Sequence, residues 1–180
     1  MDFKSEFAKV AKIEGGYSDR ASDSGGKTNH GITEAVAREY GYKGKMEDLP
    51  YETAMAIAKK KYWDVLNLDQ VSRLSERIAH ELFDTGYNMG EGTAATFLQR
   101  SLNVLNMGEE FYTDIKVDGD LGPATVGALR KYLVHRPHDG ELVMLEALNA
   151  LQGARYIDIA EHRPKDEDYV FGWFRLRVKI

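Results

Sequence analysis

The sequence predicts a mainly α-helical fold with one small, irregular β or loop element after the first helix. Apolar residues recur at helical spacing along most of the chain, and glycine or proline stands at the joints between these stretches. Five glycines lie between residues 15 and 31, among Ser, Asp, Asn and Thr. This composition is typical of a turn-rich loop or a short hairpin, so the β or loop element is expected there.

The helices follow from the apolar spacing and its end signals. In the first, Phe3, Phe7, Val10 and Glu14 share one face, and two glycines then end it. Thr33 is the expected N-cap of the second, and a proline stands at the first position of the sixth. The expected ranges are 3–14, 33–40, 51–62, 70–88, 92–106, 123–133, 139–162 and 167–177.

Composition excludes several classes of protein. The 180 residues correspond to one domain or two small lobes, and the net charge of −5, with basic residues scattered among acids, argues against nucleic-acid binding. The absence of cysteine excludes disulfides, thiolate zinc sites and cysteine nucleophiles. No apolar run reaches about 18 residues and the N-terminus has no apolar signal region, so neither a membrane span nor a secretory signal is expected.

Glu14 is the residue that points most directly to chemistry. At about 100° per residue it falls within about 20° of Phe3, in the centre of the apolar stripe of its helix. Desolvation there, and the negative end of the helix dipole, are expected to raise the pKa of its carboxyl. A carboxyl that keeps its proton near neutral pH is suited to general acid catalysis. The alternative is a helix-end residue that pairs with a lysine.

Asp23 and Thr28 follow Glu14 in the glycine-rich segment, which could fold back toward it. Glycosidic hydrolysis commonly uses one carboxylic acid to protonate the leaving oxygen and a second carboxylate to activate water or attack. Asp23 could be the second carboxylate, and Thr28 could position the water. Alternatively, Asp23 caps a glycine bend and Thr28 is only a β-ladder residue. Asp19 could be the second carboxylate in place of Asp23. The sequence is compatible with both a retaining and an inverting reaction.

The segment from Glu14 to Thr33 closely resembles the signature of glycoside hydrolase family 108, the N-acetylmuramidases of phage endolysins and bacterial lysozymes. The matching residues are Glu14-Gly15-Gly16-Tyr17, Asp23, Gly25-Gly26, Thr28 and Gly31-Ile32-Thr33. The resemblance implies a lysozyme-like helical fold, with Glu14 as catalytic acid. The order Glu14, Asp23, Thr28 also resembles the catalytic arrangement of other phage lysozymes, and this resemblance implies catalytic roles for Asp23 and Thr28.

Four further residues match this family and are candidate substrate ligands: Tyr62, Trp63, Asp84 and Asn88. Aromatic rings stack on the apolar faces of sugars, so Tyr62 or Trp63 could line a glycan cleft; core packing is the alternative. Asp84 and Asn88 are four residues apart on one helix face and could bind sugar hydroxyl or N-acetyl groups. Alternatively, they cap the helix end at Gly90.

Residues 91–180 resemble the peptidoglycan-binding module that follows this catalytic domain, and residues 1–90 are therefore interpreted as the muramidase region, the two packed as one compact unit. The resemblance depends on Leu98-Gln99, Leu102-Asn103, the turn from Val117 to Thr125, and Gly172-Trp173-Phe174 with Arg177. The turn could equally be structural, because its glycines and Pro123 suit the start of a helix.

The sequence thus predicts an endolysin-type lysozyme that hydrolyses the β-1,4 bond between N-acetylmuramic acid and N-acetylglucosamine. Peptidoglycan glycan strands are the expected partner, with no cofactor, no metal, no nucleic acid and no stable membrane insertion. A monomer is expected that stays in the host cytoplasm until lysis and then acts on the cell wall in the periplasm. The alternatives are a lytic transglycosylase, which needs no second carboxylate, and a non-catalytic wall-binding protein.

Overall fold

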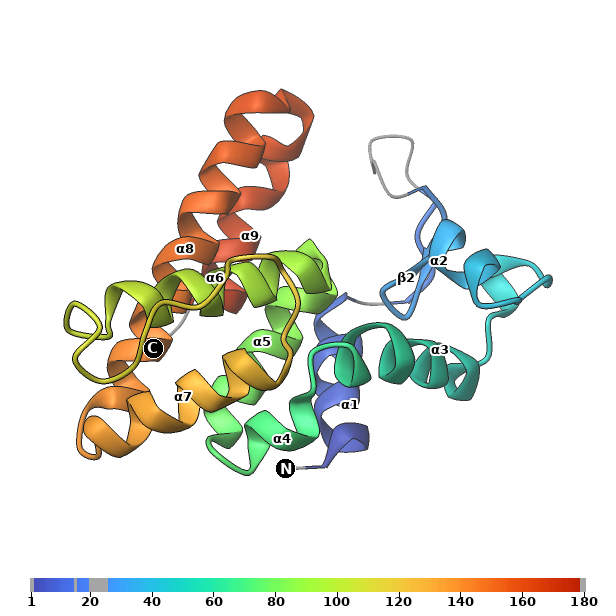
Figure 1. Ribbon diagram of the computed structural model, residues 1–180. Coiled ribbons are helices and arrows are strands. Elements are labelled where there is room, and N and C mark those ends of the chain that lie inside the picture. Colours follow the sequence, from blue (N-terminus) through green and yellow to red (C-terminus); the bar gives the residue numbers. More distant parts are fainter. Residues whose placement is uncertain (1, 15, 20–25, 179–180) are drawn as a thin grey trace. The chain divides into compact units, whose positions relative to one another are not determined.

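The computed structural model describes residues 2–14, 16–19 and 26–178, apart from the side chains of residues 13 and 14 (Figure 1). The chain divides into two compact units, Met1–Trp63 and Asp64–Ile180. This boundary is not residue 90, where the sequence divides the two functions, and that functional division stays a prediction. Each unit is described by itself.

The first unit begins with helix α1 (Phe3–Glu14), as expected. Strands β1 (Thr28–Asn29) and β2 (Ile32–Thr33) follow, then α2 (Glu34–Glu39), the 3-10 turn η1 (Met46–Asp48) and α3 (Tyr51–Ala58). The helix expected over 51–62 is α only to Ala58 and then widens into the π-helix η2 (Lys59–Asp64).

The small β element is an antiparallel hairpin in which Thr28 pairs with Thr33 and Asn29 with Ile32. His30 and Gly31 both have positive φ, 52° and 76°, as the tight turn between right-twisted strands requires. Thr33 then caps α2, because its hydroxyl accepts a hydrogen bond from the Val36 N–H. The predicted β element and the predicted N-cap are both confirmed.

An aromatic cluster forms the core of the first unit between α1 and α3. Phe7 and Val10 of α1 are fully buried, in agreement with the predicted stripe. The ring of Phe7 packs on Tyr51 at the start of α3, with 5.2 Å between centroids, and Phe3 meets the edge of Trp63 at the same separation. The start and end of residues 51–63 are thereby both packed against α1.

The second unit is built of helices: α4 (Leu68–Ser72), α5 (Glu76–Met89), α6 (Glu91–Val104), α7 (Pro123–His135), α8 (Gly140–His162) and α9 (Glu167–Arg177), with the 3-10 turn η3 (Pro164–Asp166) before α9. The last four α-helices agree with the prediction within two residues. The single helix predicted over 70–88 is wrong. It is two helices, because the hydroxyl of Ser75 accepts from the Ile78 N–H and begins a new one.

Helix α5 is the centre of the second unit and packs against α4, α6 and α8 (Figure 1). It is buried from Glu81 through Tyr87, a stretch that includes two charged residues, Glu81 and Asp84. Gly90 alone connects α5 to α6, at φ 93°. At Gly86 a β-carbon would stand 2.8 Å from the end of the Leu66 side chain, so a larger residue there would require Leu66 to move.

Gln99 of α6 holds the turn that precedes α7. Its amide nitrogen donates to the Asp118 carboxylate and the Asp120 carbonyl, both at 2.9 Å, and its oxygen accepts from the Gly119 N–H. Gly119 has a φ of 77°, and a β-carbon there would lie 3.3 Å from the Gly92 carbonyl oxygen. In the described structure Asp118, Gly119 and Asp120 of this turn are all hydrogen-bonded to Gln99. This agrees with the alternative that the turn motif is structural.

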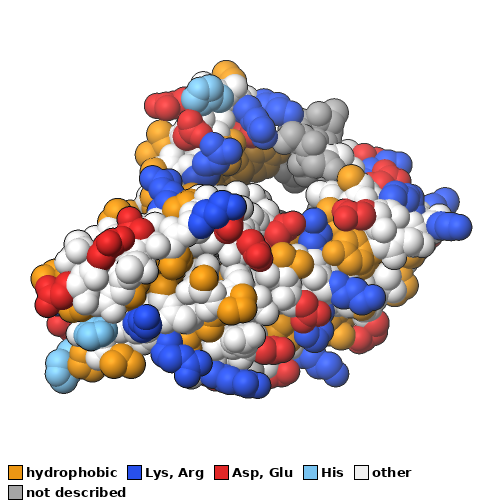
Figure 2. All heavy atoms as spheres, viewed as in Figure 1, with side chains coloured by type: hydrophobic (Ala, Val, Ile, Leu, Met, Phe, Trp, Pro, Cys, Tyr) orange, Lys and Arg blue, Asp and Glu red, His pale blue; other side chains and the backbone are white. Residues whose placement is uncertain are grey.

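None of the described helices is both long enough and apolar enough to cross a bilayer. On the face shown in Figure 2, Lys and Arg side chains alternate with Asp and Glu. The scattered charge pattern of the sequence is thus retained on the folded surface.

The first prediction concerns Gln99, whose side chain is 1% exposed. Gln99→Ala leaves several polar groups of the turn without their partner, so the free energy of unfolding should fall by about 2–3 kcal/mol. Urea denaturation followed by circular dichroism measures it. Gln70→Ala, an exposed glutamine on α4, should change stability by less than about 0.5 kcal/mol. Equal effects of the two substitutions would contradict the structural role of Gln99.

Candidate active site

Glu14 is the last residue of α1, where the sequence predicts the catalytic acid. The residues four and seven positions before it, Val10 and Phe7, are both fully buried, which confirms the apolar stripe on which the prediction depends. The side chain of Glu14 and the whole of Asp23 lie outside the described residues. Their catalytic roles therefore stay predictions.

Thr28 is held in place by the backbone. Its N–H donates to the Ser18 carbonyl at 2.9 Å, and its carbonyl accepts from the Ser18 N–H at 2.8 Å. This bridge joins the two ends of the segment that carries Asp23. Ser18 is four residues after Glu14, so chain length alone keeps its backbone within about 14 Å of Glu14. The structure thereby brings Thr28 into the neighbourhood of the α1 end.

The side chain of Thr28 faces away from the core of its unit. Successive residues of a strand point to opposite faces, and the next residue, Asn29, is 4% exposed. The Thr28 hydroxyl donates to the Gly26 carbonyl at 3.2 Å, which leaves the lone pairs of its oxygen as acceptors. A hydroxyl in this position can orient a water molecule, as the sequence predicts.

The hairpin is anchored to the rest of its unit. The buried amide of Asn29 donates to the carbonyls of Met46 and Glu47, at 2.8 and 3.3 Å. The ring of His30 meets Tyr51 edge-on, with 5.4 Å between centroids. Thr28 is therefore presented by a strand whose neighbours are tied to η1 and α3, and this fixes the position of its hydroxyl.

Tyr62 and Trp63 belong to η2 and are 6% and 1% exposed. Trp63 packs against Phe3, and the ammonium of Lys61 lies 5.7 Å from the centre of the Tyr62 ring. These contacts are those of core packing, the alternative that the sequence leaves open. Their role as sugar ligands stays a prediction.

Asp84 and Asn88 have protein partners within the second unit. The Asp84 carboxylate forms an ion pair with Arg177 of α9 in which both side chains are less than 10% exposed, and Gln152 of α8 donates to it at 3.5 Å. The Asn88 side-chain oxygen accepts from the Tyr156 hydroxyl at 2.9 Å. The sequence predicts that Asp84 and Asn88 bind sugar. Both side chains already bind protein groups, so their role as sugar ligands stays a prediction.

Glu81, one turn before Asp84, was not a sequence candidate. It is 7% exposed, and one of its carboxyl oxygens has no hydrogen-bond partner, as is also true of Asn149 Oδ1 and Gln152 Oε1. Burial, with a smaller contribution from the charge of Asp84, raises the pKa of Glu81 to about 8, against weaker lowering by Asn149, Thr85 and Arg177. A protonated Glu81 can donate to one of these acceptors, so the neutral acid fits the site.

The signal for this buried cluster is weak in the sequence. Glu81 stands in the apolar stripe of a helix, as Glu14 does, but no glycine-rich loop like that of residues 15–31 follows it directly. Its partners come from α8 and α9, nearly 70 and 100 residues later, which only the fold brings together. Among the described residues, no group of three histidine or carboxylate side chains could hold a metal ion.

Comparison with known proteins matches the two halves of the chain separately. Residues 7–90 match the family described as Glycosyl hydrolase 108, and residues 93–178 match the one described as Predicted Peptidoglycan domain. Among solved structures, that of SagA from Brucella abortus is similar, with a TM-score of 0.72 and 23% identity over 97% of this chain and 91% of that one. No curated protein matches in sequence.

The similarity to SagA concerns the fold, because the identity is low. With the described helices and the single two-stranded hairpin, it confirms the predicted fold class, mainly α and lysozyme-like with a small β element after the first helix. The order of the two matched families also confirms the predicted order of the hydrolase region and the peptidoglycan module.

The second prediction concerns the pH dependence of stability. Between pH 4.5 and about 8 the folded chain keeps a proton on Glu81 that the unfolded chain has lost. This contribution is complete below pH 4.5 and is lost as the pH rises through about 8, by at most about 1.4 kcal/mol per pH unit. Glu81→Gln, which resembles the neutral acid, should make the free energy of unfolding less dependent on pH over this range.

Urea denaturation at several pH values from 5 to 9 measures this slope. The matched control is Glu146→Gln on α8, an exposed glutamate, which should keep the wild-type slope. If Glu81→Gln also kept that slope, the buried carboxyl would be ionised in the folded state and the assignment would be wrong.

Proposed function

Because residues 7–90 match the family described as Glycosyl hydrolase 108, we propose that the chain hydrolyses the β-1,4 bond between N-acetylmuramic acid and N-acetylglucosamine. It is a glycosidase of muramidase type, and its second half is a peptidoglycan domain. The observation that carries the finer proposal is the hydrolase match over residues 7–90, which spans the end of α1 and the anchored hairpin. Within this stretch lie all three residues to which the sequence assigns catalysis.

Glu14 is the proposed general acid. It donates its proton to the glycosidic oxygen as the bond to the sugar breaks, so that the leaving group departs as an alcohol. Two features support this role: its place at the C-terminal end of α1 and the complete burial of Phe7 and Val10 on the same stripe. A carboxyl at the end of an apolar stripe, near the negative end of a helix dipole, holds its proton more tightly than one in water.

Asp23 is the proposed second carboxylate and Thr28 its helper. Asp23 either takes a proton from the attacking water or stabilises the positive charge that develops on the sugar ring. The hydroxyl of Thr28 accepts a hydrogen bond from that water and holds it in line. Support for this pair comes from the Ser18–Thr28 bridge, which joins the ends of the Asp23 segment, and from the half-buried position of Thr28 on the face of its strand opposite the buried Asn29.

The third prediction tests the acid. Glu14→Gln keeps the size of the side chain but cannot donate a proton, so clearing of purified cell walls should slow by about 10²–10⁴-fold. The turbidity of a wall suspension measures this rate. Glu39→Gln, an exposed glutamate at the end of α2 in the same unit, is the matched control and should clear walls at the wild-type rate. Full activity of Glu14→Gln would overturn the assignment.

Mass spectrometry of the released fragments identifies the bond and the reaction. Hydrolysis at the proposed bond should give fragments that end in reducing N-acetylmuramic acid. Reducing N-acetylglucosamine ends would contradict the proposed bond, and anhydro-muramic ends would mean a transglycosylase rather than a hydrolase. The wild-type chain must release soluble fragments in either case.

We further propose that the chain acts as a phage endolysin, held in the host cytoplasm until a membrane pore gives it access to the wall in the periplasm. The resemblance of the Glu14–Thr33 segment to endolysin muramidases supports this setting. As a fourth prediction, bacteria that express the chain should stay intact until their inner membrane is permeabilised, and their optical density should then fall. Cells that express Glu14→Gln should not lyse under the same treatment, and lysis without permeabilisation would contradict the setting.

A further inference from the structure

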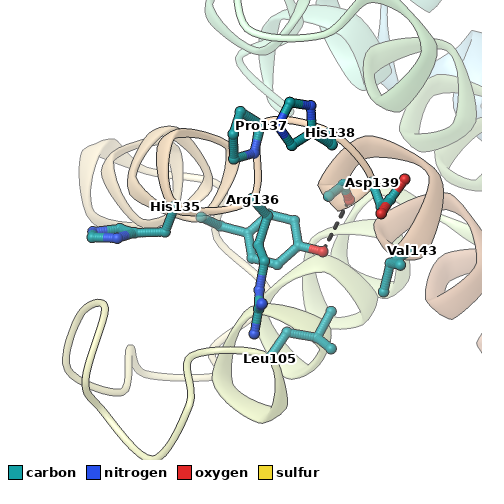
Figure 3. Close-up of a pocket in the computed structure, with 9 residues that line it drawn as sticks. Leu105, His135, Arg136, Pro137, His138, Asp139 and Val143 are labelled. Atoms are coloured by element: carbon teal, nitrogen blue, oxygen red, sulfur yellow. Dashed lines mark hydrogen bonds between the residues drawn. The ribbon is translucent and has the colours of Figure 1, made fainter.

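A cavity of about 410 Å³ lies in the second unit at the corner between α7 and α8, with the end of α6 as one wall. Its apolar wall comes from Leu105, Tyr132, Pro137 and Val143, and its polar wall from His135, Arg136, His138 and Asp139 (Figure 3). The corner lies outside the turns that the sequence relates to peptidoglycan binding. A cavity of this size accommodates a group the size of a few amino acids.

Both charged residues of the wall are available to a ligand. Arg136 and Asp139 are exposed, and neither side chain has an ion-pair or hydrogen-bond partner among the described residues. Asp139 is the N-cap of α8, yet its carboxylate makes no capping bond. Aspartate is a favoured N-cap because it usually makes that bond, so its free carboxylate is a departure from the common pattern.

The guanidinium of Arg136 is held by packing rather than by a counter-ion. It lies over the ring of Phe111, 5.0 Å from the centroid, and His135 stacks on the same ring at 4.5 Å. A guanidinium that packs over an aromatic ring still has N–H groups available to donate to a planar acceptor, such as a carboxylate. In the view of Figure 3, Arg136 extends toward Leu105, and Asp139 lies on the other side beside Val143.

The corner itself is rigid. The Tyr132 hydroxyl donates to the Gly140 carbonyl at 2.9 Å, and the Gly140 N–H donates to the Arg136 carbonyl at 3.0 Å. A β-carbon at Gly140 would stand 2.5 Å from that of Arg136, so glycine is required for the turn to close. The two charged side chains therefore start from a fixed backbone, which lowers the entropy cost of binding.

From this arrangement we infer that the cavity binds the free end of a peptidoglycan stem peptide, which carries a carboxylate and an ammonium group. The Arg136 guanidinium donates hydrogen bonds to the carboxylate, and the Asp139 carboxylate accepts them from the ammonium group. The apolar wall contacts the aliphatic part between the two charged groups. The inference rests on the proposed function in one respect, that the partner is the bacterial wall. It deepens that function by assigning the peptide, rather than the glycan, to the second unit.

A peptide fits this cavity better than a sugar. Sugars commonly bind proteins by stacking on an open aromatic face, but Tyr132 is 1% exposed, and Phe111, whose ring packs with Arg136 and His135, does not line the cavity. An unpaired cation and an unpaired anion in one cavity match a ligand that has both charges. The hydroxyl groups of a neutral glycan can hydrogen-bond with both side chains but carry no charge to match theirs, so each contact is weaker than an ion pair.

The fifth prediction tests this with a synthetic probe, the tripeptide L-alanyl-γ-D-glutamyl-diaminopimelic acid, added to the whole chain. Isothermal titration calorimetry should show one saturable site, and Arg136→Gln and Asp139→Asn should each weaken binding about tenfold or more, since each removes a charge-assisted hydrogen bond. The same peptide with carboxamides in place of its carboxylates should bind about as weakly to the wild type. The control Arg130→Gln, an exposed arginine on α7, should bind like the wild type.

The inference is overturned if the tripeptide shows no saturable binding, or if Arg136→Gln and Arg130→Gln bind it equally well. Preferential binding of a peptide-free glycan oligomer would assign the cavity to sugar instead and would overturn it too. Because binding is measured without cleavage, its failure is distinct from failure of the proposed function. A chain that cuts walls but does not bind the tripeptide contradicts only this inference.

Discussion

The burial of Asp84 in the centre of α5 is the constraint on which the second unit depends. A carboxylate that is less than 10% exposed must be paired, and its partner, Arg177, comes from the last helix of the described chain. Breaking such a pair costs about 3–5 kcal/mol, a large part of the 5–15 kcal/mol by which a domain is typically stable. The fold of residues 64–178 therefore cannot be complete until α9 has packed on α5.

The rest of the buried cluster follows from this pair. The side-chain amide of Gln152 on α8 donates to Asp84 and Thr85, and these bonds hold α8 against α5. Burial, with a smaller contribution from the charge of Asp84, raises the pKa of Glu81 to about 8. The neutral form of Glu81 therefore adds no second buried charge beside the Asp84–Arg177 pair at neutral pH. The charge of Arg177 is matched by one carboxylate rather than two.

The sequence predicted most of the helices and the hairpin better than it predicted the packing. Helical spacing and the glycines gave the first helix, the hairpin and the cap at Thr33, because these depend on neighbours a few residues away. It missed the break at Ser75, where a local hydroxyl cap interrupts a continuous apolar stripe. It also missed Glu81, since the groups that surround this residue lie on helices far along the chain. No local pattern carries that information.

The two units offer different kinds of structure to the proposed ligands. In the first, the hydroxyl of Thr28 stands on a two-residue strand that is held by backbone pairing on both sides. In the second, the buried cluster around Asp84 connects α5, α8 and α9, and two exposed charged residues of this unit, Arg136 and Asp139, line a cavity at a helix corner. Chemistry that needs placed oxygens fits the first arrangement, and binding of a charged peptide end fits the second. Charges that remain unpaired in a fold that pairs its buried ones are the residues most available for a ligand.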